Sequence, residues 1–144
     1  MEEVFLPIEC YTKHRDPMLV VSALVKMHSK GQIAVKTVLK ENGIYFLNGK
    51  FSHLWLIEIM AQSITSLLGY QDLKLRKRIS GEGIIVKVDS FKLFVPSYFL
   101  KVNDEIITEV TLEARFEKIN HCFTRATINS SILAEARLTG FEHE

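Results

Sequence analysis

The sequence has little cysteine and no excess of either charge. Its two cysteines, Cys10 and Cys122, lie far apart and belong to no CxxC or Cys/His metal pattern. Such a pair is expected to remain as free thiols in a reducing compartment. The 18 Lys and Arg residues nearly balance the 17 Asp and Glu residues. The chain as a whole therefore gives no electrostatic reason to expect nucleic-acid binding.

Long hydrophobic runs and targeting signals are also missing. The longest apolar stretch, residues 54–68, is too short and too often polar to span a bilayer, and the acidic N-terminus lacks the basic and apolar regions of a signal peptide. No HxxxH motif or carboxylate cluster occurs, so we predict no metal and no cofactor. We expect a cytoplasmic protein with a single domain over residues 1–144.

One strongly apolar segment is present, at residues 53–68. It is apolar around most of its circumference, with Ser52 as a possible N-cap and Gly69 as a possible end, which predicts a helix buried on most sides. Its polar residues form one narrow stripe at i, i+4, i+7 and i+8: Glu58, Gln62, Thr65 and Ser66. We expect a polar partner or a water-lined cavity to face this stripe.

Strand patterns lie on both sides of this helix. Residues 18–27 and 32–40 predict a hairpin. Alternation of period two then predicts strands at residues 82–95, 104–117, 122–128 and 132–141. One apolar helix and five or six mostly antiparallel strands indicate an α+β fold in which the sheet wraps the helix.

Four motifs, taken in order, resemble one protein family. They are "HRDPMLVV" (14–21), "IEIMAQS" (57–63), "VPSYFLKVNDEI" (95–106) and "LAEARL" (133–138). Together they resemble the 3-hydroxyacyl-[acyl-carrier-protein] dehydratases, and the short loop before the helix is similar to the dehydratase-like subunits of aryl-polyene type pathways. The resemblance covers nearly the whole chain. It implies a hotdog fold, with an antiparallel sheet of five or six strands around one long central helix.

The resemblance also implies a mechanism. In the family an imidazole removes the proton alpha to a thioester carbonyl, while a helix carboxylic acid protonates the departing β-hydroxyl. Glu58 matches that acid, and burial among apolar neighbours would favour its protonated form. The start of the helix would hold the carbonyl oxygen. The implied substrate-binding residues are Asn48, Gly49, Lys50, Phe51, Leu54 and Gln62.

The family's catalytic histidine is missing from its usual place, where this chain has Lys50 in a shortened loop. Three interpretations stay open. In the first, His53 of one subunit is the base that works with Glu58 of another subunit. In the second, Lys50, a water or a histidine of a different hotdog chain supplies the base. In the third, the domain only binds or scaffolds an acyl chain, with a thioesterase as a variant. We take His53 as the leading candidate. His14 and Arg15 are interpreted as fixing the N-terminal segment through hydrogen bonds.

The predicted function is dehydration of 3-hydroxyacyl thioesters on acyl carrier protein, with an auxiliary acyl-binding subunit or an acyl thioesterase as alternatives. The basic cluster after the helix is where an acidic carrier would dock: Lys74, Arg76, Lys77 and Arg78. Because sites in the family form between subunits, we expect a homodimer or larger homo-oligomer, or a heterodimer with another hotdog protein. We expect no nucleic-acid or membrane partner.

Overall fold

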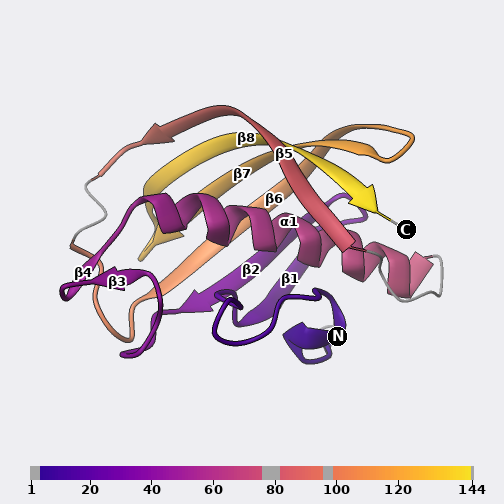
Figure 1. The fold of residues 1–144 in the computed structure, drawn as a ribbon. Coiled ribbons are helices and arrows are strands. Elements are labelled where there is room, and N and C mark those ends of the chain that lie inside the picture. The colour runs from indigo at the N-terminus through magenta and orange to yellow at the C-terminus, as the bar shows by residue number, and fades with distance from the viewer. Residues whose placement is uncertain (1–3, 76–81, 96–98, 144) are drawn as a thin grey trace.

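The computed structural model describes residues 4–75, 82–95 and 99–143, which form one wrapped sheet around one helix (Figure 1). The elements follow in the order η1 (Ile8–Cys10), β1 (Ala23–Ser29), β2 (Gln32–Val38), β3 (Phe46–Leu47), β4 (Lys50–Phe51), α1 (Leu54–Leu75), β5 (Glu82–Leu93), β6 (Glu105–Phe116), β7 (Ile119–Ile128) and β8 (Ser131–His143). The strands predicted from period-two alternation are confirmed, with shifted ends.

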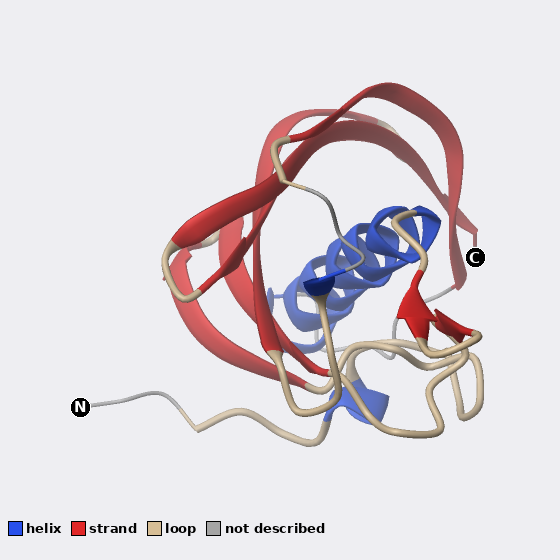
Figure 2. Ribbon diagram, turned by 90° about the vertical axis from the view of Figure 1, so that its left-hand side faces the viewer, coloured by secondary structure: helices blue, strands red, loops and turns tan. Residues whose placement is uncertain are grey.

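Six strands form a single antiparallel sheet in the order β1-β2-β6-β7-β8-β5. Figure 2 shows this sheet curving around α1, so that the helix lies inside the bend. β6, β7 and β8 follow one another as a meander, whereas β5 pairs with β8 and forms one edge of the sheet. The predicted α+β architecture, a sheet wrapped around a central helix, is confirmed.

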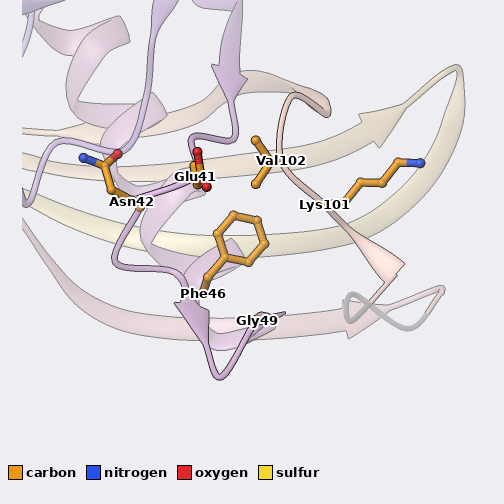
Figure 3. Close-up of a pocket in the computed structure, with 7 residues that line it drawn as sticks. Glu41, Asn42, Phe46, Gly49, Lys101 and Val102 are labelled. Carbon is orange, nitrogen blue, oxygen red and sulfur yellow. The ribbon is translucent and has the colours of Figure 1, made fainter.

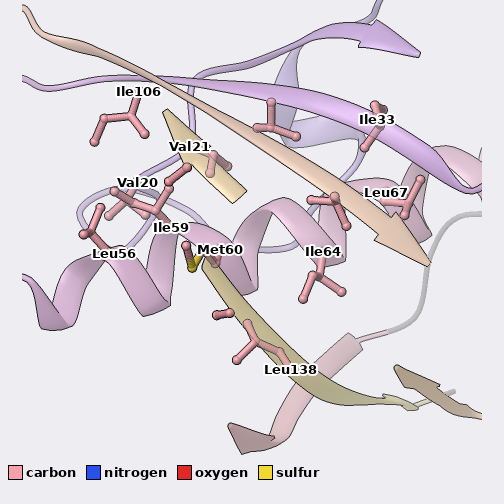
Figure 4. Packing of buried hydrophobic residues seen from close by; sticks show 14 of the residues in the cluster. Val20, Val21, Ile33, Leu56, Ile59, Met60, Ile64, Leu67, Ile106 and Leu138 are labelled. Carbon is pink, nitrogen blue, oxygen red and sulfur yellow. The ribbon is translucent and has the colours of Figure 1, made fainter. Parts of the chain in front are cut away.

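The core lies between α1 and the concave face of the sheet (Figure 4). Leu56, Ile59 and Met60 of the helix are fully buried, as are Ile33 and Leu138 of the sheet. Serines on the buried side of the helix do not leave unsatisfied hydroxyls, because Ser63 Oγ and Ser66 Oγ donate to carbonyl oxygens four residues earlier at 2.7 Å each. Among the described residues, no helix combines the length and apolar character needed to cross a membrane.

The helix continues past the end that the sequence predicts. Gly69 was expected to stop it, but α1 runs to Leu75. A Cβ at Gly69 would overlap the backbone carbonyl of Tyr11, so glycine is needed there for the close approach of the N-terminal segment. The prediction that the helix stops at Gly69 was wrong. The pattern around Gly69 is local, whereas the N-terminal segment that requires this glycine is distant in sequence.

A short hairpin precedes α1. β3 and β4 pair Phe46 with Phe51, and the two residues between the strands, Asn48 and Gly49, both have positive φ, at 53° and 75°. This is the conformation that an Asn-Gly hairpin turn adopts. The rings of Tyr45 and Phe51 pack with centroids 5.6 Å apart under the hairpin. The turn thus fixes the entry of the chain into the helix.

Candidate active site

Glu58 lies on the second turn of α1, and its side chain is 36% exposed. The Nε2 group of Gln62, one turn later, donates a hydrogen bond of 2.9 Å to its Oε1 atom. The carboxyl is therefore only partly buried, and Leu54 at the helix start is 65% exposed. The carboxyl is thus accessible to a ligand.

His14 is the imidazole that the structure brings to Glu58. Its Nε2 atom lies 3.8 Å from Glu58 Oε1, and its side chain is 32% exposed. The sequence interpretation gave His14 an anchoring role, and the contact of 2.8 Å between its Nδ1 atom and Thr12 Oγ1 fits that role, but the approach of Nε2 to Glu58 was not predicted. The signal that could have found it was the "HRDP" motif beside a threonine at position 12.

The segment that carries His14 is held on the helix by Gln62, which is completely buried. Its Oε1 accepts from the Val20 N–H and its Nε2 donates to the Met18 carbonyl, both at 2.8 Å. Figure 1 shows this indigo segment beside α1. The same amide group bonds Glu58, so one side chain positions both the acid and the segment that carries the imidazole.

Arg15 stiffens the same segment, as the sequence predicts. Its Nη1 donates to the carbonyls of Thr12 and His14 at 2.8 Å each, and its Nη2 to that of Glu9 at 3.2 Å. Three carbonyl contacts from one planar guanidinium restrict the backbone on both sides of His14. The loop therefore presents the imidazole in a defined place without regular secondary structure.

Three residues of the helix's polar stripe, Glu58, Gln62 and Thr65, contact this segment. Thr65 Oγ1 lies 3.1 Å from Thr12 Oγ1 and donates to the Gln62 carbonyl at 2.9 Å. Thr12 Oγ1 in turn lies 2.8 Å from His14 Nδ1. The prediction that something polar faces the stripe is confirmed, and its partner is the chain's own N-terminal segment.

Two of the other predicted site residues, His53 and Lys50, make no hydrogen bond or ion pair with Glu58 in the described part of the chain. His53 is exposed at the start of α1, and within the described residues its side chain forms no hydrogen bond or ion pair. Lys50 is exposed on the β3–β4 hairpin beside the Asn48–Gly49 turn, while Phe51 is 3% exposed and belongs to the core. Within one chain, His53 and Lys50 are not brought to Glu58.

A separate pocket of about 500 Å³ lies beside the hairpin. It is lined by Glu41, Asn42, Gly43, Phe46, Gly49, Lys101 and Val102 (Figure 3). Of the predicted substrate-binding residues, Gly49 is the one in this lining. The pocket does not include the His14–Glu58 pair.

The predicted carrier-docking cluster falls mostly outside the described residues, which is where Arg76, Lys77 and Arg78 lie. Lys74 is exposed near the end of α1. In the described part of the chain no three His, Cys, Asp or Glu side chains are grouped as a metal site would require.

The sheet wrapped around one central helix defines a hotdog-fold protein, and the helix carries the Glu58 carboxyl beside the His14 imidazole. A family model for ApeP-like proteins, described as ApeP dehydratase, matches residues 6–144, and the chain belongs to this family of dehydratases. The resemblance noted in the sequence, to dehydratase-like subunits of aryl-polyene type pathways, is thereby confirmed. No curated protein matches the sequence.

Solved structures share the fold. The dehydratase heterocomplex ApeI:P from Xenorhabdus doucetiae is similar with a TM-score of 0.88 and 18% identity, over 98% of this chain and 93% of that one. The smu.793 protein from Streptococcus mutans UA159, bound to acetyl CoA, has a TM-score of 0.61 and 15% identity, over 84% and 87%. A hypothetical thioesterase with coenzyme A from Streptococcus pneumoniae TIGR4 has a TM-score of 0.60 and 15% identity, over 83% and 84%.

Proposed function

We propose that this chain dehydrates a 3-hydroxyacyl thioester carried on acyl carrier protein, with His14 as the base and Glu58 as the acid. The observation that carries the proposal is the distance of 3.8 Å between His14 Nε2 and Glu58 Oε1. The α-proton and the β-hydroxyl of such a substrate are on adjacent carbons, so two groups this close can act on both. Membership of a dehydratase family supports the same reaction.

The reaction needs one proton removed and one supplied. The lone pair of His14 Nε2 takes the α-proton, and the electrons of the C–H bond form the Cα–Cβ double bond. The Cβ–O bond breaks, and the leaving oxygen takes the proton of the Glu58 carboxyl and departs as water. The products at the enzyme are an imidazolium and a carboxylate.

These products lie next to each other, which resets the site. A proton passed from His14 to Glu58, directly or through one water, restores the starting forms across 3.8 Å. The start of α1 keeps the role of holding the thioester carbonyl that the sequence predicts.

We further propose that a second hotdog chain pairs along β5. This strand is an edge of the sheet, and its Val86 and Val88 are 56% and 43% exposed. Exposed apolar side chains on a long unpaired edge favour strand addition by another chain. The similar ApeI:P structure is described as a heterocomplex, which supports assembly of this kind. The acidic carrier would approach along the basic cluster, of which Lys74 is described.

The test uses the purified full chain with a 3-hydroxyacyl thioester on acyl carrier protein, alone and with a second hotdog protein. Formation of the enoyl thioester is followed by mass spectrometry as loss of water. We expect Glu58→Gln and His14→Ala each to lower the rate by about 10²–10⁴-fold, the usual contribution of a general acid or base. His28→Ala, an exposed histidine on β1, is the matched control and should keep the full rate.

His53→Ala separates the two candidate bases. If His14 is the base, His53→Ala keeps most of the activity; if His53→Ala abolishes activity and His14→Ala does not, the base comes from His53 of a neighbouring subunit. Release of free acid would instead identify a thioesterase. Absence of any product, even with the second hotdog protein, would leave an auxiliary acyl-binding subunit.

A further inference from the structure

A chain of hydroxyl groups connects the helix backbone to the imidazole of His14. It begins at the Gln62 carbonyl, which accepts from Thr65 Oγ1 at 2.9 Å. Thr65 Oγ1 lies 3.1 Å from Thr12 Oγ1, and Thr12 Oγ1 lies 2.8 Å from His14 Nδ1. The chain thus joins two threonines that are 53 residues apart in sequence and ends on the nitrogen that faces away from Glu58.

The direction of this chain follows from the number of protons available. A carbonyl can only accept, so Thr65 uses its single hydroxyl proton on Gln62. Thr65 Oγ1 must then accept a hydrogen bond from Thr12, so the single hydroxyl proton of Thr12 is used in that bond. Thr12 Oγ1 can therefore only accept from its remaining neighbours, which are His14 Nδ1 and, at 3.4 Å, the His14 N–H.

We propose that Thr65 and Thr12 act as a proton-orienting relay that keeps the imidazole proton of His14 on Nδ1. Nε2 then carries a lone pair and faces Glu58 in the form that a base requires. The ring nitrogen that holds the proton is set by the hydrogen bond made by the other nitrogen. Both threonines are positioning residues, because they act on His14 and not on the substrate.

The surroundings of the relay favour this direction. Thr12 is 4% exposed, so water does not readily replace its bonds. In the opposite direction, Thr65 would donate to Thr12 and lose its hydrogen bond to the Gln62 carbonyl. The imidazole proton would then lie on Nε2, and Glu58 Oε1, at 3.8 Å from that atom, is beyond hydrogen-bond range. The Gln62 carbonyl also accepts from Ser66 Oγ at 2.7 Å, so it would keep one hydrogen bond without Thr65. The position of the His14 imidazole proton is therefore the quantity to measure.

The experiment is ¹⁵N NMR of the imidazole in the full-length protein, at a pH where His14 is neutral, with its signals assigned from His14→Gln. In the unmodified protein we expect the proton on Nδ1 and an unprotonated Nε2. Thr65→Val, which keeps the shape and removes the hydroxyl, should move the proton toward Nε2, and so should Thr12→Val. Thr12→Ser and Thr65→Ser, which keep the hydroxyls, should restore the original signals.

A matched control removes a buried threonine hydroxyl elsewhere. Thr37 in β2 is completely buried, and its Oγ1 has no hydrogen-bond partner among the described residues, so Thr37→Val should leave the His14 signals unchanged. A proton on Nε2 in the unmodified protein would overturn the relay, as would signals that stay the same in both folded Thr→Val variants.

The catalytic consequence rests on the proposed function and has its own measurement. Thr65→Val should lower kcat by between about tenfold and 10⁴-fold, the upper figure being the cost of a wrong imidazole tautomer in a serine protease triad, with little change in KM. The serine variant should recover the rate. If NMR finds the Nδ1 proton but no dehydration occurs, the proposed function fails and the relay stands.

Discussion

At the scale of single residues, Gln62 determines how the site is assembled. Its side chain makes three hydrogen bonds of 2.8–2.9 Å, to Glu58, Met18 and Val20, and it is completely buried. When one partner of a buried hydrogen bond is removed, the cost of leaving the other group unpaired exceeds the net contribution of the bond to stability. Gln62 is therefore constrained by all three hydrogen bonds at once. Sequence reasoning assigned it to substrate binding, whereas the structure gives it internal partners, so that it positions Glu58 and the segment that carries His14.

Cys122 on β7 allows a prediction about pH. Burial, with a smaller effect of Glu113, raises the pKa of this thiol from the ordinary 9.0 to about 12. Below pH 9 the folded and unfolded chains both carry the thiol; between 9 and 12 only the unfolded chain ionises. Unfolding then releases a proton, so the free energy of unfolding should fall as pH rises, by up to roughly 1.4 kcal/mol per pH unit from this residue.

The measurement is guanidinium unfolding between about pH 8 and about pH 11. Cys122→Ala should have a shallower decline with pH than the unmodified protein, while Cys10→Ala, at an exposed thiol, should decline in the same way. If the free energy of unfolding of Cys122→Ala fell with pH as steeply as that of the unmodified protein, the assignment of this pH dependence to Cys122 would be contradicted. Tyr45, whose pKa burial also raises, contributes equally in all three proteins.

At the scale of elements, α1 serves both as the core of the fold and as the platform of the site. One side of it packs under the sheet, and the polar stripe binds the N-terminal segment. That segment approaches the helix closely at Gly69, where the Tyr11 carbonyl occupies the space of a Cβ. Tyr11 is 1% exposed, and its ring lies 5.8 Å from that of Tyr70.

Gly69→Ala should therefore destabilise the protein, although glycine to alanine inside a helix normally stabilises it. We expect a loss of roughly 1–3 kcal/mol in the free energy of unfolding, the usual cost of overpacking. The proposed dehydration should also slow, because His14 lies three residues beyond Tyr11. Denaturant unfolding measures the first effect and the thioester assay the second.

Gly31→Ala is the control for this substitution. A Cβ there would meet Leu112 Cβ at 3.6 Å, an ordinary contact, so its effect on stability should be small. Equal stability of the Gly69→Ala and unmodified proteins would mean that the N-terminal segment does not press on the helix as described.

At the scale of the whole molecule, the sheet ends in two different edges. β5 is twelve residues long with Val86 and Val88 exposed, whereas β1 is seven residues long, and each strand has two register shifts against its neighbour. A long edge strand offers more unpaired backbone groups to another chain than a short one does. The two edges therefore provide an internal comparison for the proposed assembly along β5.

We expect the purified chain to have a mass twice that of its 16.5-kDa sequence in light scattering. The double substitution Val86→Lys and Val88→Lys should shift it toward the single-chain mass, because charges on an edge oppose strand addition. Val25→Lys on β1, at a valine that is 40% exposed, should not. The reverse pattern would place the interface on β1, and a single-chain mass that becomes double only with another hotdog protein would identify a heterodimer.

The sequence by itself determined the class of fold and the place of Glu58 on the polar stripe of the helix. Period-two alternation and one apolar helix are local patterns, so the wrapped sheet and the stripe containing Glu58 could be predicted from them. The motif order was sufficient to identify the family resemblance. The end of the helix could not be predicted from the sequence. A glycine that ends a helix and a glycine that allows the close approach of another backbone segment cannot be distinguished by residue type alone.

Only the tertiary structure decided which imidazole meets Glu58. His53 is five residues away in sequence, but it is exposed at the start of α1; His14 is 44 residues away, but lies 3.8 Å from the carboxyl. That contact depends on Gln62 and Arg15 holding a segment with no regular secondary structure against the helix. No local pattern encodes such docking, because its hydrogen bonds join residues that become neighbours only after the chain has folded.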